Sequence, residues 1–345
     1  MMKFDKERFL GAWWGAYTGE AFSMPTSGYV EISSVEKEYG KIRDMLSPKS
    51  PHPDCTMPMI LSKLPQLKPQ YDFINEKMTF WKCPGTHFHA TLQAGENTLQ
   101  LFLALHLANE LIEKKKFDDI AWFKRYEAVM CTPNGYNDLY VPAMQRTYFE
   151  NLNLGKCPQD HGVYEANLGD IAYMLPLLLL YSLRPEHAID SQYKIFKRFV
   201  RSEGSPNAST FLSKVLYMLM CGETLETVLF EKFKPDAHYT LAFPYRRWVK
   251  GGRDAAVLDI FSTAANLENS LPLSFYLALK YKHSFEEALC ANAQLGGESA
   301  GRGSIIGMLM GAQHGTAKIP ARWAEKLVYI NEINALGEGL LNTFA

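Results

Sequence analysis

GGESAGRGSIIGMLMGAQHGTAKIPARW, from Gly296 to Trp323, is a segment in which glycine recurs at close to one helical turn. Its later glycines stand four residues apart, at Gly303, Gly307, Gly311 and Gly315. Residues at this spacing share one face of an α-helix, so another helix or a ligand can approach the bare backbone there. A tightly packed helix pair is the simpler interpretation, and a ligand contact is the alternative.

The same segment carries one carboxylate near its start, Glu298, directly after two glycines. Gly296 and Gly297 permit a positive φ angle or a close approach of a ligand just before that acid. If Glu298 only begins a surface helix, we expect it to pair with Arg302 one turn later. A position in a cleft is the equal alternative, because a surface helix alone does not explain the paired glycines.

A second glycine series, GAWWGAYTGEAFSMPTSG, lies near the N-terminus and begins at Gly11. Gly11, Gly15 and Gly19 stand four residues apart, and the acidic Glu20 follows them. Both ends of the chain therefore combine a thin helix face with a nearby acid.

A third segment, HATLQAGENTLQLFLALHLANELI, runs from His89 to Ile112 and contains Glu96 and Asn97. Thr98 is expected to open a helix whose apolar face comprises Leu99, Phe102, Leu103, Leu107 and Leu111. An acid at a helix start commonly stabilises the helix dipole, so Glu96 is either a capping residue or a functional acid.

Helical periodicity extends along the whole chain, and no segment alternates as strands do. With 345 residues and 47% hydrophobic residues, the chain has ample material for one large domain or two ordinary ones. We predict a single all-α domain over residues 1–345. The expected helices are 4–19, 96–115, 117–131, 168–183, 188–202, 207–221, 223–232, 253–266, 271–280, 284–293 and 302–314. The proline-rich segment 47–81 is expected to be a long loop, either over a cleft or as a surface excursion.

Together these segments resemble the ADP-ribosylglycohydrolase family, over roughly Phe9 to Leu327. The resemblance rests on the Gly-acid-Ala-x-x-x-Pro turn that ends at Pro25, the acidic helix start near Glu96, and the Gly-Gly-acid segment that leads into Gly-Ala-x-x-Gly and Ile-Pro-x-x-Trp. The middle of the chain, with CTPNGYNDLYVPAMQRTYFENL and YEANLGDIAYMLP, is more similar to the branch that contains the J-class lens crystallins of jellyfish.

The resemblance implies an orthogonal multi-helix bundle whose cleft holds a pair of magnesium ions. The positions that match the family's metal motifs are Glu20, Glu96, Asn97, Thr98, Glu298 and Ser299. Because several expected aspartates are absent here, and Mg²⁺ depends on carboxylate ligands, we expect one weakly bound ion or none rather than two. A further acid that the hydrolases often carry after the proline falls near Thr26 or Ser27, which cannot ionise usefully.

If catalysis is retained, the resemblance points to cleavage of a glycosidic bond with Glu96 and Glu298 as the reacting acids. Their carboxyl groups are expected to lie within about a water's bridge of each other in one concave pocket, where each would raise the other's pKa. The predicted ligand-binding residues are His87, His89, His161, Asn167, Gly169, Gly297 and Arg302.

The two histidines before Glu96 allow several interpretations. His87 and His89 would face one side of an extended segment, where they could bind a transition metal, contact a phosphate, donate a proton or be purely structural. A short pair without further matched spacing is more often structural. His161 and Asn167 correspond to the region in which the hydrolases hold a ribose or diphosphate, where backbone amides can do so without charge.

Two functions of different classes follow from this comparison. The first is a hydrolase of an ADP-ribosyl or related N- or O-glycosidic bond, acting on a small-molecule or ADP-ribosylated substrate. The second is a catalytically silent relative that binds a nucleotide-like ligand or serves structurally, as crystallins do. The sequence leaves the oligomeric state open.

The net charge and the cysteine spacing indicate which partners and which cellular compartment to expect. A net charge of −1 with dispersed lysines argues against a nucleic-acid surface. The six cysteines show no short paired spacing, which indicates reduced thiols and a cytoplasmic protein. The longest apolar run, Ile171 to Tyr181, is too short to cross a bilayer, and MMKFDKERF lacks a signal-peptide core.

Overall fold

The computed structural model of the protein describes residues 4–345, and these residues form helices and loops without a β-strand. The predicted all-α class is therefore confirmed for the described residues, while residues 1–3 of the predicted domain and of the MMKFDKERF segment lie outside them. The longer helices are α1 (Lys6–Ser23), α2 (Ile32–Tyr39), α5 (Leu99–Lys114), α6 (Asp119–Cys131), α7 (Ala143–Asn153), α10 (Pro185–Phe199), α11 (Gly204–Met220), α14 (Asp254–Phe261), α15 (Leu267–Lys280), α16 (Phe285–Gln294), α17 (Ser299–His314) and α19 (Ile330–Phe344). The shorter ones are α3 (Met57–Leu61), α4 (Met78–Lys82), α8 (Leu168–Ala172), α9 (Leu175–Leu180), α12 (Leu225–Thr227), α13 (Tyr245–Gly251) and α18 (Ala321–Ala324).

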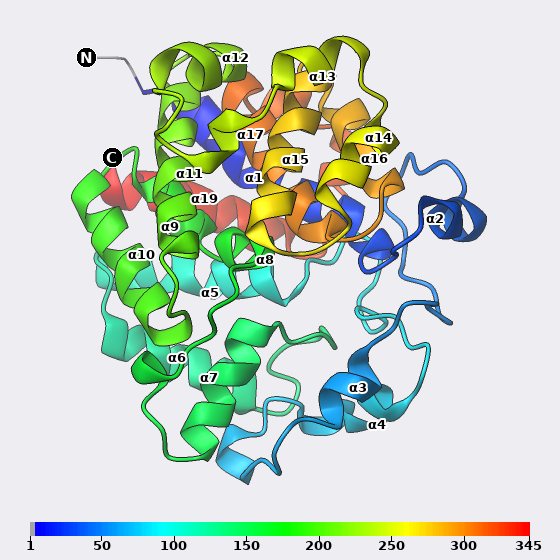
Figure 1. The fold of residues 1–345 in the computed structure, drawn as a ribbon. Coiled ribbons are helices and arrows are strands. Elements are labelled where there is room, and N and C mark those ends of the chain that lie inside the picture. The colour runs from blue at the N-terminus through cyan, green and yellow to red at the C-terminus, as the bar shows by residue number, and fades with distance from the viewer. Residues whose placement is uncertain (1–3) are drawn as a thin grey trace.

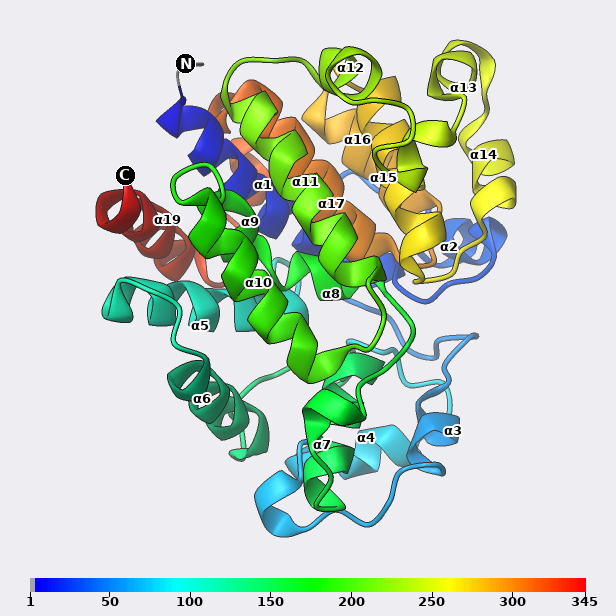
Figure 2. The ribbon, with the colours of Figure 1, turned by 60° about the vertical axis from the view of Figure 1, so that its left-hand side comes forward.

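The two glycine-spaced helices, α1 and α17, pack against each other at the centre of the molecule. They lie side by side in Figures 1 and 2, coloured blue and orange. The glycines face one another in antiparallel order, with Gly11 against Gly311, Gly15 against Gly307 and Gly19 against Gly303. A Cβ atom on any of these glycines would overlap a backbone carbonyl oxygen of the other helix. The thin faces therefore serve a helix pair, which was the simpler of the two predictions.

The antiparallel register brings two distant acids to the same end of this pair. Glu20 follows Gly19 near the end of α1, and Glu298 is the residue immediately before α17. Helices α11, α15 and α16 pack against α17, and α19 packs against α1 and α5. These packing contacts thus fix the position of the segment that carries Glu20 relative to the segment that carries Glu298.

Most predicted helices are present, but several boundaries and elements differ. The expected helix 168–183 is broken into α8 and α9. Pro176 stands in the first turn of α9, where its missing N–H is harmless, whereas one continuous helix would lose that hydrogen bond and clash with the preceding turn. The expected helix 253–266 ends at Phe261, and α17 begins at Ser299 rather than at residue 302. Helices α2, α3, α4, α7, α13, α18 and α19 were not predicted.

The proline-rich segment 47–81 is anchored to the rest of the protein. It contains α3 and α4, which lie at the lower right of Figure 1. Met57, Phe73 and Trp81 are buried, and the Trp81 indole donates a hydrogen bond to the Leu139 carbonyl at 3.0 Å. These contacts fix the segment beside the 136–141 loop.

Two further features concern the cysteines and the helix lengths. All six cysteines are unpaired, as the absence of short paired spacing predicted. Among residues 4–345, none of the helices combines the length and apolar character needed to cross a bilayer.

Candidate functional site

A cavity of about 450 Å³ lies where the C-terminal end of α1 meets the N-terminal end of α17. This volume falls within the usual range for small-molecule sites. Its walls come from several separate parts of the chain and include Glu20, Ser27, Thr56, Phe88, His89, Thr98, Gln100, Asp138, Tyr140, Arg146, Asn167, Gly169, Asp170, Thr263, Gly297 and Glu298. Segments that are far apart in the sequence therefore converge on one concave surface.

The paired glycines place Glu298 in the wall of this cavity. Gly296 and Gly297 have φ angles of +66° and +61°, a conformation that residues with a side chain rarely adopt. The backbone of Gly297 exchanges two hydrogen bonds with the neighbouring loop, donating to the Tyr29 carbonyl at 2.7 Å and accepting from Gly28 N–H at 2.8 Å. The Glu298 N–H donates to the Thr263 carbonyl at 3.2 Å. The double glycine thus builds a tight turn that holds this acid.

Asp170 is a second carboxyl group in the cavity, and it is fully buried. Its Oδ1 accepts a hydrogen bond of 3.4 Å from Gln100, whose own side chain is held by Gln145 at 2.8 Å. Its Oδ2 is buried without a hydrogen-bond partner among the described residues. Burial, reinforced by the nearby charge of Glu298, raises the pKa of Asp170 to about 7. Asp170 therefore carries a proton part of the time at neutral pH.

Glu298 itself is half-buried and faces the cavity. Burial raises its pKa, and this effect is partly offset by the positive charges of Arg302 and His89. The sequence predicted that Glu96 and Glu298 would raise each other's pKa; in the structure it is Asp170 whose pKa the charge of Glu298 raises.

Glu20 is buried at the base of the cavity and accepts three hydrogen bonds from the start of α5. The donors are Thr98 N–H at 3.0 Å, Thr98 Oγ1–H at 2.7 Å and Asn97 Nδ2–H at 3.0 Å. Burial outweighs these bonds and raises the pKa of Glu20 to about 8. Both oxygens of Glu20 are therefore occupied by protein donors.

Glu96 does not line this cavity, so the structure does not bring it together with Glu298 as expected. Its carboxylate accepts hydrogen bonds from Gln93 N–H at 3.0 Å and from the Asn137 side chain at 2.9 and 3.1 Å. The Glu96 N–H in turn donates to the Gln93 carbonyl at 3.1 Å. Glu96 thereby closes the turn that leads into α5, and the structure pairs Glu298 with Asp170 and Glu20 instead.

Arg302, a predicted ligand-binding residue, is fully buried and does not line the cavity, so the alternative of a surface pair with Glu298 does not hold either. Its guanidinium donates to the Asn292 side chain at 2.9 Å and to the Gly296 carbonyl. Burial lowers its pKa to about 10, which still leaves it charged at neutral pH. Arg302 braces the glycine turn from behind rather than contacting a ligand.

The predicted histidines separate into different environments. His87 is fully buried, with Nε2 3.0 Å from the Pro25 carbonyl and Nδ1 accepting from His89 N–H at 3.0 Å. Both of its ring nitrogens are therefore used by the backbone, and burial holds its pKa well below the ordinary value. His161 is exposed and bonds to the Cys157 carbonyl at 3.1 Å, outside the cavity. Of the three, His89 lines the cavity.

The residues expected to ligate magnesium hydrogen-bond mainly to one another or to the backbone. Asn97 donates from its amide nitrogen to Glu20 and to the Tyr17 carbonyl at 2.9 Å. Ser299 is buried and donates to the Ser23 carbonyl at 2.8 Å. Among residues 4–345, no group of three or more His, Cys, Asp or Glu side chains is arranged to hold a metal ion. This donor set does not fit a pair of octahedral magnesium sites.

The remaining predicted ligand-binding positions, Asn167, Gly169 and Gly297, line the cavity. Sequence reasoning assigned no site role to Asp138, Asp170, Gln100, Tyr140 or Arg146, which line it too. Asp170 lies in the first turn of α8, where an acidic residue commonly serves only to stabilise the helix dipole. Asp138 and Tyr140 lie in a loop whose path only the folded structure reveals.

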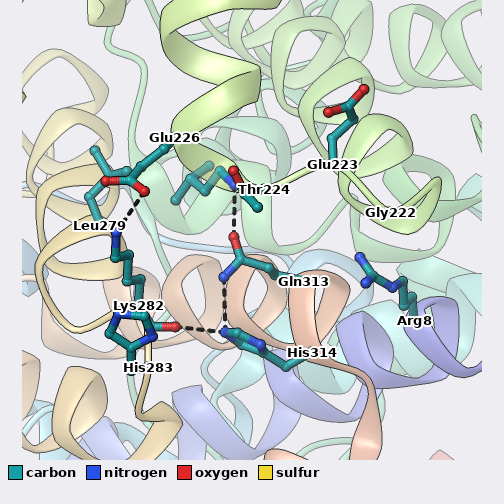
Figure 3. A pocket seen from close by; sticks show the side chains of 11 residues that line it. Arg8, Gly222, Glu223, Thr224, Glu226, Leu279, Lys282, His283, Gln313 and His314 are labelled. Carbon is teal, nitrogen blue, oxygen red and sulfur yellow. Dashed lines mark hydrogen bonds and ion pairs between the residues drawn. The ribbon is translucent and has the colours of Figure 1, made fainter.

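A second cavity, of about 300 Å³, lies at the opposite end of α17 (Figure 3). Gln313 and His314 line it, about 20 Å along the helix from Gly301. Its polar groups are largely paired within the protein: Lys282 with Glu226 at 2.6 Å, and the Gln313 side-chain oxygen with Leu225 N–H at 2.7 Å. We therefore place the candidate site in the larger cavity, where Asp170 has a carboxyl oxygen without a hydrogen-bond partner among the described residues.

Asp170→Asn is expected to stabilise the protein increasingly as pH rises. An unfolded aspartate loses its proton near pH 4, whereas folded Asp170 keeps its proton to about pH 7. The unfolded state binds fewer protons between these values, so this residue makes stability fall as pH rises through that window. Asparagine removes the effect, and the gain at pH 8 is at most about 4 kcal/mol. Urea unfolding at pH 4.5 and pH 8 measures it.

The matched control is Asp236→Asn, which changes an exposed aspartate and should shift stability equally at both pH values. An Asp170→Asn effect that is independent of pH would show that this carboxyl group is not held protonated by the fold.

Comparisons with known proteins identify relatives of the whole chain. The sequence model of the family described as ADP-ribosylglycohydrolase matches residues 1–345. A solved structure described as "ADP-ribosylglycohydrolase-related protein complex" is similar with a TM-score of 0.64 and 22% sequence identity, and the match covers 99% of this chain and 99% of that chain. No curated protein sequence matches significantly. The expected fold type is thereby confirmed, while the crystallin-like branch and the cytoplasmic location stay predictions.

Proposed function

Because the chain belongs to the ADP-ribosylglycohydrolase family, and this membership suggests glycosyl hydrolase activity, we propose that the protein is a hydrolase. In its larger cavity it cleaves the N- or O-glycosidic bond of an ADP-ribosyl or related group. Fold alone does not carry this proposal, since function depends on the site. The observation that carries it is the pair of carboxyl groups, Asp170 and Glu298, that face one cavity in different environments.

The two acids suit the two proton transfers of glycoside hydrolysis. Glu298, supported by the charge of Arg302, takes a proton from a water molecule while the oxygen of that water attacks the anomeric carbon. The bond from that carbon to the leaving atom breaks, and its electron pair stays with the leaving group. Asp170, protonated near neutral pH, donates its proton to that group. The products are the free sugar and the protonated leaving group.

The mouth of the cavity offers contacts for the rest of such a substrate. Phe88 and Tyr140 form an aromatic wall, with ring centroids 5.4 Å apart at 83°. Arg146 lies over the Tyr140 ring, 5.9 Å from its centroid, and lines the same cavity. An arginine in this position suits a diphosphate, and the aromatic rings suit a base or sugar face.

Two measurements test the proposal: calorimetric titration with ADP-ribose, and release of ADP-ribose from ADP-ribosylated peptides. We expect both binding and release, and we expect Arg146→Ala to weaken ADP-ribose binding about tenfold. Arg247→Ala, at an exposed position away from the cavity, is the matched control.

The outcomes separate the two functions considered. Binding without release would favour a catalytically silent relative that retains a nucleotide-like ligand. Absence of ADP-ribose binding at millimolar concentration would contradict the proposal.

A further inference from the structure

His89 has the most distinctive surroundings of the histidines near the cavity. Its Nδ1 lies 2.8 Å from Asp138 Oδ1, and both side chains are buried at the cavity wall. Asp138 is held by the backbone, since its Oδ2 accepts from Leu99 N–H at 2.9 Å at the start of α5. Asp138 therefore orients the ring so that Nδ1–H donates to it.

The neighbouring histidines lack this arrangement. His87 uses both ring nitrogens on the backbone, as described above. His52 is bound likewise, with Nε2 3.1 Å from the Ser27 carbonyl and Nδ1 accepting from Asp54 N–H at 3.1 Å. Among these three neighbouring rings, His89 has a carboxylate on one nitrogen and no hydrogen bond to a described residue on the other.

The charges that act on His89 come from several elements. Burial alone would lower its pKa, but the charge and hydrogen bond of Asp138, together with the charge of Glu298, outweigh burial and raise it; Glu20 adds to this effect in its ionised form. His52 and His87 disfavour a further positive charge, but both have lowered pKa values and are neutral near pH 7.

The base of the cavity is balanced in charge by its own residues. The raised pKa values of Glu20 and Asp170, about 8 and about 7, allow protons to neutralise these two acids. Apart from the exposed Glu165, the anions that remain in the cavity wall are Asp138, which has His89, and Glu298, which has Arg302 and His89. A divalent ion would add positive charge where little negative charge is left unpaired.

We propose that His89, held by Asp138, is the built-in cation of this cavity and takes the place of a divalent metal beside Glu298. The inference rests on the proposed function, in which Glu298 must stay ionised to accept a proton. His89 is then a positioning residue that acts through Glu298, and hydrolysis proceeds without added magnesium.

Two measurements decide this inference without relying on turnover. In protein labelled with ¹⁵N-histidine, the His89 signal is identified by its loss in His89→Gln. We expect both ring nitrogens of His89 to carry protons at pH 7 and the ring to become neutral in Asp138→Asn. Calorimetric titration with magnesium chloride should show no saturable binding below about 1 mM. A neutral His89 in the parent protein would overturn the inference, as would submillimolar magnesium binding that is lost in Glu298→Gln.

Turnover provides the third measurement. We expect activity to persist in EDTA, to fall at least about tenfold in His89→Ala, and to be partly restored by added imidazole. The control is His283→Ala, which replaces an exposed histidine. Its activity should equal that of the parent protein and should not change when imidazole is added. Activity that requires magnesium would overturn the inference. If the parent protein shows no turnover with or without magnesium, the proposed function fails, while the NMR and calorimetric results still decide the role of His89.

Discussion

Replacing Glu298 with glutamine is expected to lower turnover at least about 100-fold while leaving the melting temperature nearly unchanged or slightly raised. Glutamine keeps the shape of the side chain but cannot accept the proton of the attacking water. Stability should not suffer, because burial already disfavours the charge of this carboxylate. Steady-state kinetics on an ADP-ribosylated substrate and a thermal melt measure the two effects.

Two further variants make this test specific. Glu298→Asp retains the carboxylate but shortens its reach, so we expect partial activity. Glu96→Gln should act mainly on stability, because Glu96 accepts hydrogen bonds from Gln93 and Asn137 outside the cavity. Equal losses of turnover in Glu96→Gln and Glu298→Gln would return the reacting pair to the one that the sequence suggested.

The second large effect is expected at the contact between α1 and α17, where Gly15→Ala or Gly307→Ala should destabilise the protein by about 3 kcal/mol. The added methyl group would overlap a backbone carbonyl oxygen of the other helix, which cannot rotate away as a side chain can. The helix backbones would have to separate, and this cost exceeds the gain of up to about 1 kcal/mol from the better helix propensity of alanine. Urea unfolding measures the difference.

Gly251→Ala is the matched control for these substitutions. Gly251 lies at the end of α13, and a Cβ there would meet open space. We expect the control to be neutral or slightly stabilising. If Gly15→Ala and Gly307→Ala behaved in the same way, the two helices would not be in backbone contact in solution.

The central helix pair could be predicted from sequence because the glycine spacing that produces it is periodic and lies within each helix. Glycines four residues apart reveal a thin face wherever the partner helix lies. Helix α19 escaped prediction although Ile333, Gly337, Leu340 and Phe344 share its buried face. Two of its residues are glycines, which lowered its apparent helix propensity, and Gly337 in fact makes room for the Trp13 ring.

The site was harder to predict than the fold because its residues are joined by tertiary contacts. Glu298 could be found from the double glycine beside it. Asp138 becomes meaningful only through its hydrogen bonds to His89 and Leu99, residues that lie 49 and 39 positions away in the chain. Glu96 misled because its place in the sequence resembles a ligand position, while its side chain turns toward Asn137.

The contact between α1 and α17 also constrains the order in which the protein assembles. Residues 6–23 leave the ribosome long before residues 299–314, which form the surface they pack against. Until then the nascent chain must keep its first helix without its partner, and the loop that finally closes spans most of the chain. The cavity that lies at this junction therefore cannot form before α17 has been made, and a truncated chain that lacks α17 would have no site at all.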